Sequence, residues 1–278
     1  MKSTAAILRT PHWSAIQSQP LLLAVGGPTA SGKTELAIAL AQALDGEIVN
    51  ADSRQVYRGM DIGTAKPTNA QRATVPHHLI DIVDPVQPFS LGLYVRVAHV
   101  VIRDIQSRGR LPVLTGGTGL YLRAITQGYQ VPEVAPDPGL RGQLESEIAN
   151  GGLRALVERL RALDPEGAAM LDTKNPRRVI RALEVSLATG KPFSATQRRD
   201  PRYRSLTILL DGENDVLFPR ADARLDRMMA EGFADEVSRL LAAGYEPELP
   251  AFSALGYREL ARAARAECSR EAAVAEIR

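Results

Sequence analysis

The chain has 278 residues, of which 45% are hydrophobic, and a formal net charge of +2 at pH 7. A chain of this length and composition buries a core in one large domain or two, and its short apolar runs exclude a membrane-spanning helix. Its single cysteine, Cys268, excludes an intrachain disulfide, so we expect the reducing environment of the cytoplasm.

The first 20 residues carry Lys2 and a short apolar stretch, but Pro11 follows too soon for the hydrophobic core of a signal peptide. We expect residues 1–20 to form a flexible tail. Across the chain, 29 of the 34 basic residues are arginine, the side chain whose planar guanidinium suits phosphate and carboxylate groups. A genome rich in G and C explains the same bias equally well.

The first motif follows a predicted buried strand at residues 21–25 and reads GGPTASGKTELAIAL over residues 26–40. It matches G-x-x-x-x-G-K-[ST], a pattern whose glycines let backbone N–H groups surround phosphate oxygens. The helical pattern that follows directs the positive end of a helix at the same anion. We therefore predict a cradle for a diphosphate or triphosphate rather than a plain glycine turn. Its residues are Gly27, Pro28, Thr29, Ala30, Ser31, Gly32, Lys33 and Thr34.

Strand and helix patterns alternate through the first half of the chain. Further strands are predicted at residues 47–52, 77–83 and 111–117, and a helix at residues 91–106. This order predicts an α/β fold with a P-loop NTPase-like parallel sheet flanked by helices. His77 and His78 have no metal-binding spacing to another His or Cys, and we interpret them as structural.

The pattern changes at residue 131, where a proline-rich segment precedes about sixty residues with helical periodicity. This change predicts an inserted, mainly helical domain at residues 131–204. The core is then made of residues 21–130 and 205–278, with a strand at residues 205–212 and two helices after it.

Ligands of open parallel sheets bind at the carboxyl ends of the strands. Asp52 closes one predicted strand and opens the polar segment DSRQVYRGMDIGTAKPT, residues 52–68, which is too long for a simple turn. The sequence GGTG, residues 116–119, closes another strand. Asp52 faces the P-loop if the two strands are neighbours. A helix cap or a magnesium ligand of a kinase is the alternative role for this carboxylate.

These motifs together resemble one family, the tRNA dimethylallyltransferases, also called tRNA isopentenyltransferases. The resemblance covers almost the whole chain after residue 20, and the 52–68 segment is its most specific part, since the P-loop alone fits many kinases. The family usually continues into a basic C-terminal segment, whereas this sequence ends at Arg278 within a helical pattern. The other matching segments are GPTASGKT (27–34), HHLIDIVDP (77–85), GGTGLYL (116–122), NPRRVIRALEV (175–185) and SALGYREL (253–260).

The resemblance implies a reaction as well as a fold. The P-loop would hold dimethylallyl diphosphate with Mg²⁺ on Thr34, and an adenosine adjacent to the anticodon would attack through its exocyclic amine. Asp52 matches the family's base, and Thr29 matches a residue that faces the reacting centre. Arg224, with Arg220 second, matches cations that bind the diphosphate from one helix face, for which a solvated face is the alternative.

The resemblance also assigns residues to tRNA. Asn175 and Pro176 suit a helix start, so that the arginines after them lie on exposed turns, where surface charge without a partner is the alternative. The full predicted set is Asp52, Ser53, Arg54, Gln55, Thr118, Arg141, Arg177, Arg178, Arg181, Ser253, Gly256, Tyr257 and Arg258.

The partners expected from the resemblance are the tRNA anticodon stem-loop and dimethylallyl diphosphate, with the chain acting as a monomer and away from membranes. Three alternatives stay open at this point. They are a nucleotide or small-molecule kinase, an adenylate isopentenyltransferase that accepts free AMP, and a non-catalytic RNA-binding module.

Overall fold

The computed structural model describes residues 21–132, 134–196 and 198–278, so the tail expected at residues 1–20 lies outside the described residues. The chain divides into two compact units. The core unit runs to Thr126 and resumes at Pro201–Arg278, and the helical unit is Gln127–Asp200.

The insertion was predicted at residues 131–204, whereas the helical unit begins at Gln127 and ends at Asp200, four residues earlier at each end. Two segments that flank the helices pair with each other and so belong to the helical unit. Gln130 N donates to Arg198 O at 2.9 Å, and Asp200 N donates to Gly128 O at 2.8 Å.

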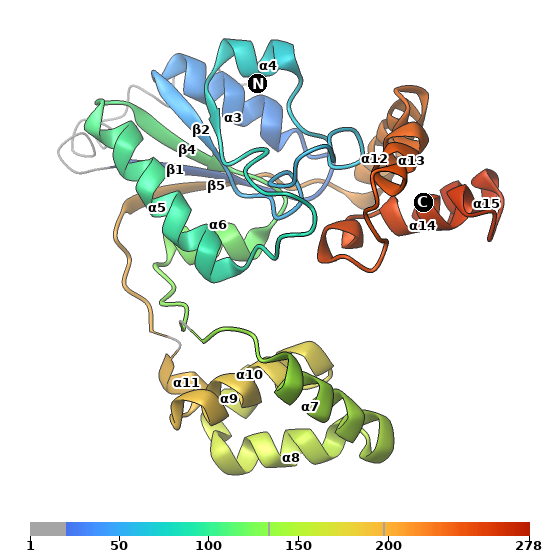
Figure 1. Cartoon of the computed structure of the whole chain (residues 1–278). Coiled ribbons are helices and arrows are strands. Elements are labelled where there is room, and N and C mark those ends of the chain that lie inside the picture. The colour runs from blue at the N-terminus through green and yellow to red at the C-terminus, as the bar shows by residue number, and fades with distance from the viewer. Residues whose placement is uncertain (1–20, 133, 197) are drawn as a thin grey trace. The chain divides into compact units, whose positions relative to one another are not determined.

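The core unit is built on a five-stranded sheet in the order β3-β2-β4-β1-β5, with every strand pair parallel. Buried apolar runs such as that of β1 are typical of parallel strands covered on both faces. Helix α3 covers one face, and α5 and α6 cover the other (Figure 1). The predicted α/β sheet is therefore confirmed. The elements are β1 (Leu21–Gly26), α3 (Lys33–Ala43), β2 (Gly46–Asn50), α4 (Asn69–Thr74), β3 (His77–His78), α5 (Leu91–Ser107), β4 (Leu111–Thr115), α6 (Gly119–Thr126) and β5 (Arg204–Leu209).

The strand predicted at residues 77–83 is wrong beyond its first two residues. Leu79 and Asp81 have φ angles of 62° and 59°, in the left-handed region, which ends the extended run. The backbone then bonds to the loop after β2, where Ile82 N donates to Val56 O at 2.9 Å. The polar segment after Asp52 is thereby fixed along part of its length.

The strand order corrects one further expectation. Strands β1 and β2 are not neighbours, because β4 lies between them. The parallel arrangement still brings the carboxyl ends of all three strands to one edge of the sheet, where the P-loop, Asp52 and the GGTG sequence follow them.

Residues after β5 form four α-helices and one 3₁₀ helix rather than the two helices predicted. Gly232, Gly244 and Gly256 have φ angles of 97°, 87° and 93°, and these left-handed residues divide the Arg-rich and Ala-rich pattern into separate helices. The helices pack on the loop after β2 through a shared core that includes Tyr57 and Phe233. They are α12 (Asn214–Ala230), α13 (Phe233–Ala242), η1 (Pro250–Ser253), α14 (Tyr257–Ala264) and α15 (Arg270–Ile277).

The helical unit has its own apolar core, centred on leucines and valines of α7, α8 and α10. Helices α7, α9 and α10 each begin with a proline. The residue before each proline is an Asp or Asn whose side-chain oxygen accepts a hydrogen bond from a backbone N–H of the first turn. The described helices of the whole chain include none that is long and apolar enough to cross a membrane. The helices of this unit are α7 (Pro138–Gly151), α8 (Leu153–Leu163), α9 (Pro165–Met170), α10 (Pro176–Thr189) and α11 (Phe193–Thr196).

Candidate active site

The P-loop joins β1 to α3 and is shaped by two glycines. Gly32 precedes α3 with a φ angle of 84°, a left-handed conformation that glycine adopts without strain. A Cβ atom on Gly27 would lie 2.7 Å from Ser31 Oγ and 3.0 Å from Leu210 O, so a larger residue would push the loop apart. The loop therefore leaves the N–H groups of the first turn of α3 available to an anion.

Two cations from distant parts of the chain lie at this loop. Lys33 Nζ donates to Pro28 O at 3.1 Å, so the side chain folds back over the loop. Burial lowers the pKa of Lys33, and the charge of Arg224 on α12 lowers it further. Burial also lowers the pKa of Arg224. A bound diphosphate would favour the charged forms of both side chains, which burial disfavours.

One hydroxyl of the loop has no hydrogen-bond partner among the described residues. Ser31 Oγ is buried and unpaired there. Buried hydroxyl groups in folded proteins nearly always make hydrogen bonds, and a phosphate oxygen would accept the proton of this one.

Asp52 is held by three backbone N–H groups. Its Oδ1 accepts from Arg54 N at 2.8 Å and from Gln55 N at 3.4 Å, and its Oδ2 accepts from Gly117 N at 3.1 Å. These bonds fix the orientation of the carboxylate at the junction of the loops after β2 and β4.

The GGTG sequence is required by the close approach of these two loops. A Cβ atom on Gly116 would lie 2.2 Å from the carbonyl carbon of Ala51, which no small shift relieves. Thr118 then joins the loops through its hydroxyl, which accepts from Ser53 N at 2.9 Å and donates to Ser53 Oγ at 3.1 Å.

A cavity of about 930 Å³ in the core unit brings the predicted catalytic groups together. Burial lowers the pKa values of Lys33 and Arg224, and the negative charge of Asp52 in the same cavity offsets part of this lowering. Arg224, which the sequence favoured as the diphosphate-binding cation, is half-buried, and Arg220 is exposed. The wall includes Thr29, Lys33, Thr34, Asp52, Arg220 and Arg224.

The predicted tRNA residues between 253 and 258 differ in exposure. Ser253 and Arg258 are exposed, whereas Tyr257 is fully buried and its hydroxyl donates to Glu236 at 2.6 Å. The prediction that the Tyr257 side chain contacts tRNA is therefore wrong for this structure, because the ring is part of the core. Gly256 is also buried, and its left-handed backbone begins α14.

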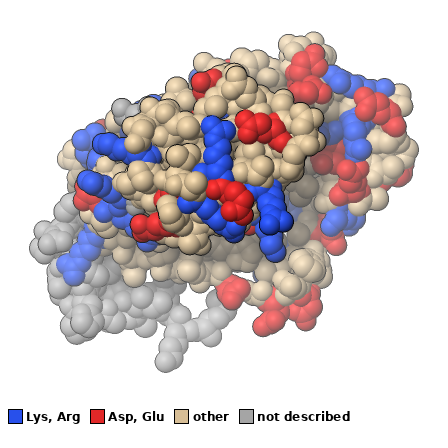
Figure 2. All heavy atoms as spheres, turned by 90° about the horizontal axis from the view of Figure 1, so that it is seen from below, with Lys and Arg blue, Asp and Glu red and all other residues tan. Residues whose placement is uncertain are grey.

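The predicted arginines of the helical unit also differ in their surroundings. Arg141 donates through Nε and Nη2 to the buried Glu184 at 2.8 and 2.9 Å, and Arg181 also bonds to this carboxylate. Arg177 and Arg178 are exposed. Figure 2 shows basic and acidic side chains interspersed over the face that it draws, without one wide area of positive charge. Arg177 and Arg178 are thus the better candidates for phosphate contacts.

Two buried charged residues that shape the site were missed from the sequence. Glu236 of α13 accepts from Asp61 N and Ile62 N at 2.9 and 2.8 Å and so anchors the loop after β2. Nothing in its helical pattern marks it. Lys66 lies inside the 52–68 segment near two acidic residues, and a lysine among Gly, Thr and Pro was a signal that could have found it.

The residues at the P-loop include oxygen donors of the kind that suit a magnesium ion. Within the described ranges, no three His, Cys, Asp or Glu residues are grouped so that they could hold a metal ion. The Thr34 hydroxyl and the Asp52 carboxylate line the cavity. Such oxygen donors suit Mg²⁺, which usually completes its shell with substrate phosphates and water.

Two family models match the sequence. The model described as IPP transferase matches residues 55–278, and that described as isopentenyl transferase matches residues 21–80. A tRNA dimethylallyltransferase of Roseiflexus sp. (strain RS-1) is 56% identical over 217 residues, which are 78% of this chain and 71% of the relative. Another, from Syntrophobacter fumaroxidans, is 51% identical over 264 residues, 93% of this chain and 76% of the relative.

Solved structures agree with these matches. The full-length tRNA isopentenylpyrophosphate transferase of Bacillus halodurans is 40% identical with a TM-score of 0.67, over 93% of this chain and 82% of that one. A eukaryotic dimethylallyltransferase acting on tRNA is 27% identical with a TM-score of 0.77, over 92% of this chain and 66% of that one. With a family model over most of its length and relatives more than half identical, the chain belongs to the tRNA dimethylallyltransferase family.

Proposed function

We propose that this chain transfers a dimethylallyl group from dimethylallyl diphosphate to the exocyclic N6 amine of an adenosine adjacent to the anticodon in tRNA, releasing pyrophosphate. The observation that carries the proposal is that the Asp52 carboxylate lines the same cavity as Lys33 and Arg224. Alkylation of an amine by an allylic diphosphate needs a proton acceptor that faces a cationic cradle for the leaving group.

The P-loop side of the cavity would bind the donor. N–H groups of the loop and the ammonium group of Lys33 would surround the diphosphate, and Arg224 would approach from α12. Thr34 would hold Mg²⁺, which supplies further neutralisation of the leaving group when it is bound. These contacts strengthen as the C–O bond breaks and charge moves onto the pyrophosphate.

The Asp52 side of the cavity would receive the adenosine. The lone pair of its exocyclic amine is delocalised into the ring, so the free amine is a weak nucleophile. As the N–C bond forms at the allylic carbon, the amine proton passes to Asp52, whose orientation is fixed by backbone N–H groups. Thr29 also lines the cavity, and it would face the reacting centre.

The helical unit would contact the tRNA. Exposed Arg177 and Arg178 would bind phosphates of the anticodon stem-loop, and the adenosine would be turned out of its loop at a cost of a few kcal/mol. A tRNA substrate is consistent with action as a monomer in the cytoplasm.

The test is incubation with labelled dimethylallyl diphosphate and, in turn, tRNA, AMP or no acceptor. We expect label in tRNA alone, a severe loss of transfer in Lys33→Ala and no hydrolysis of ATP. Label in AMP would indicate an adenylate isopentenyltransferase, and ATP hydrolysis stimulated by a small alcohol would indicate a kinase. If labelled donor gives no product with any acceptor, the transferase proposal is wrong.

A further inference from the structure

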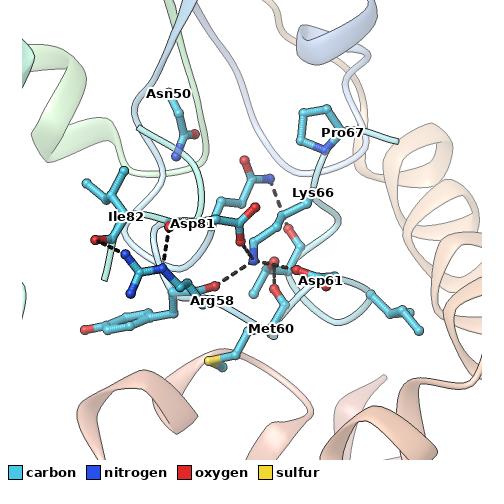
Figure 3. Close-up of polar contacts among 12 residues, drawn as sticks. Asn50, Arg58, Met60, Asp61, Lys66, Pro67, Asp81 and Ile82 are labelled. Carbon is cyan, nitrogen blue, oxygen red and sulfur yellow. Dashed lines mark hydrogen bonds and ion pairs between the residues drawn. The ribbon is translucent and has the colours of Figure 1, made fainter. Parts of the chain in front are cut away.

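Lys66 is a buried lysine whose ammonium group joins three parts of the loop region. Its side chain is 2% exposed, and Nζ donates to Tyr57 O and Asp61 Oδ1, each at 2.6 Å, and to Asp81 Oδ1. Figure 3 shows these contacts meeting at the lysine nitrogen between Asp61 and Asp81. All three donor positions of the ammonium group are therefore used within the protein.

These contacts fix the sharp corner of the chain just before Lys66. Ala65 has a φ angle of 50°, which an alanine rarely adopts, and its N–H donates to Ile62 O at 2.9 Å. Lys66 N donates to Asp61 O at 3.0 Å, so the backbone and the side chain of Lys66 both tie the corner to Asp61. The ion pairs thus support a backbone conformation that is locally unfavourable.

The corner in turn orients the side chain of Gln55. Gln55 Nε2 donates to Thr64 O at 3.1 Å and to Ala65 O at 3.0 Å. An amide oxygen could not lie against two carbonyl oxygens, so these acceptors decide which way the amide points. Both hydrogens of the amide are used, and the oxygen remains as its hydrogen-bonding group.

The free oxygen of Gln55 is an acceptor at the cavity that contains Asp52. Gln55 and Asp52 both line this cavity. Gln55 Oε1 has no hydrogen-bond partner among the described residues. The unpaired side-chain atoms that are shielded from solvent there do not include it, so solvent reaches this oxygen. The adenosine amine carries two hydrogens, and a site with two acceptors matches both, one at the Asp52 carboxylate and one at the Gln55 oxygen.

We propose that Lys66 is a positioning residue that acts through Gln55, holding its amide oxygen towards the adenosine amine and so contributing to acceptor selection. This inference rests on the proposed function. Lys66 lines the same cavity, but its three donor positions are used within the protein, so it would donate no hydrogen bond to either substrate. Its effect would be confined to tRNA, because the Lys66 contacts include no P-loop residue.

The principal variant is Lys66→Met, which keeps an unbranched side chain of similar length without the charge. The fold is expected to survive, because Asp81 keeps an ion pair with Arg72 at 3.0 Å and the side chain of Asp61 is 60% exposed. Arg108→Met is the control. It also removes a cation that pairs with a carboxylate of the core unit, the buried Glu47, but neither Arg108 nor Glu47 lines the cavity.

The readout is binding of two anticodon stem-loops, one with adenosine and one with purine riboside, which lacks the amine, at the modified position. The wild type should prefer adenosine through hydrogen bonds to both Asp52 and Gln55, and the Gln55 bond should contribute a factor of roughly three to ten to that preference. Gln55→Ala should lose this Gln55-dependent factor, and Lys66→Met should lose most of it, whereas Lys66→Arg should keep part of it. The double variant Gln55→Ala with Lys66→Met should be no less selective than Gln55→Ala.

A purely structural role for Lys66 predicts different results. Loss of folded protein lowers the active fraction but leaves the adenosine preference of the remaining molecules unchanged, as expected for Arg108→Met. An unchanged preference in folded Lys66→Met, or a second loss added to that of Gln55→Ala, would overturn the inference. If Lys66→Met does not fold, Asp61→Ala removes one anchor at an exposed side chain and should reduce the same preference.

The result separates this inference from the proposed function. Wild-type transfer of the dimethylallyl group to tRNA tests the function, and the affinity of the dimethylallyl diphosphate donor should be unchanged in Lys66→Met. If the wild type transfers the group but the variant keeps the adenosine preference, only the role of Lys66 is wrong.

Discussion

Asp52→Asn tests whether this carboxylate is the base. Asparagine keeps the shape and one oxygen, which can still accept the N–H groups of Arg54 and Gln55, but it cannot take a proton at neutral pH. The amide nitrogen then faces Gly117 N, which loses its bond of 3.1 Å. Gly117 is exposed, so water replaces that bond and the stability cost should be about 1 kcal/mol or less.

The kinetic effect should be much larger than the structural one. A general base contributes typically about 10² to 10⁴ in rate, so single-turnover transfer should fall by that factor. Donor affinity should hold or rise, because Asp52 opposes the positive potential of Lys33 and Arg224, which attracts the diphosphate.

The assay combines single-turnover transfer of the labelled group, tRNA affinity and donor affinity, with circular dichroism to confirm folding. Asp104→Asn, at an exposed carboxylate of α5, is the control. Near wild-type transfer by folded Asp52→Asn would show that Asp52 is not the base. A joint loss of donor affinity and magnesium dependence would instead identify Asp52 as a metal ligand.

Three further predictions concern tRNA binding and stability. Arg177→Ala should reduce the slope of log affinity for tRNA against log salt by about 0.7, with donor affinity unchanged, and an unchanged slope would mean that this exposed arginine binds no phosphate. Glu184→Gln should make the free energy of unfolding less dependent on pH below 4.5. Burial by itself would raise the pKa of Glu184, but hydrogen bonds to its carboxylate, of which that from Arg141 is the strongest, lower the pKa from 4.5 to about 2. The stabilisation from this carboxylate, up to about 3 kcal/mol, is present above pH 4.5 and is lost as pH falls towards 2, and a urea-unfolding series with the same pH dependence in the variant would contradict this. Gly116→Ala should destabilise the core unit, because its Cβ atom would lie 2.2 Å from the carbonyl carbon of Ala51. Gly142→Ala, whose Cβ atom would meet no heavy atom within 4 Å, should instead stabilise α7 by about 1 kcal/mol. Thermal unfolding measures both, and equal shifts of the melting temperature would refute the close approach at Gly116.

The sequence alone determined the features that depend on short-range pattern. The alternation of apolar strand patterns with helix patterns along the chain predicted a parallel sheet, because helices between consecutive strands bury their apolar faces by packing on that sheet. The P-loop was predicted because its glycines, lysine and threonine act at fixed spacing within one turn of chain. Asp52 was found for a related reason, since the carboxyl ends of parallel strands meet at one edge.

Tertiary structure decided which side chains keep a free polar group for a ligand. The sequence presents Arg141 and Arg177 alike, but Arg141 bonds to Glu184, which lies 43 residues further along the chain and already pairs with Arg181 one helical turn away. Tyr257 likewise belongs to the core because Glu236, 21 residues earlier, accepts its hydroxyl. The left-handed residues Leu79 and Asp81 ended a strand that their apolar neighbours predicted. For Arg141 and Tyr257 a contact between residues distant in sequence outweighs the local preference, and at Leu79 and Asp81 the backbone conformation does, so only the folded chain shows the outcome.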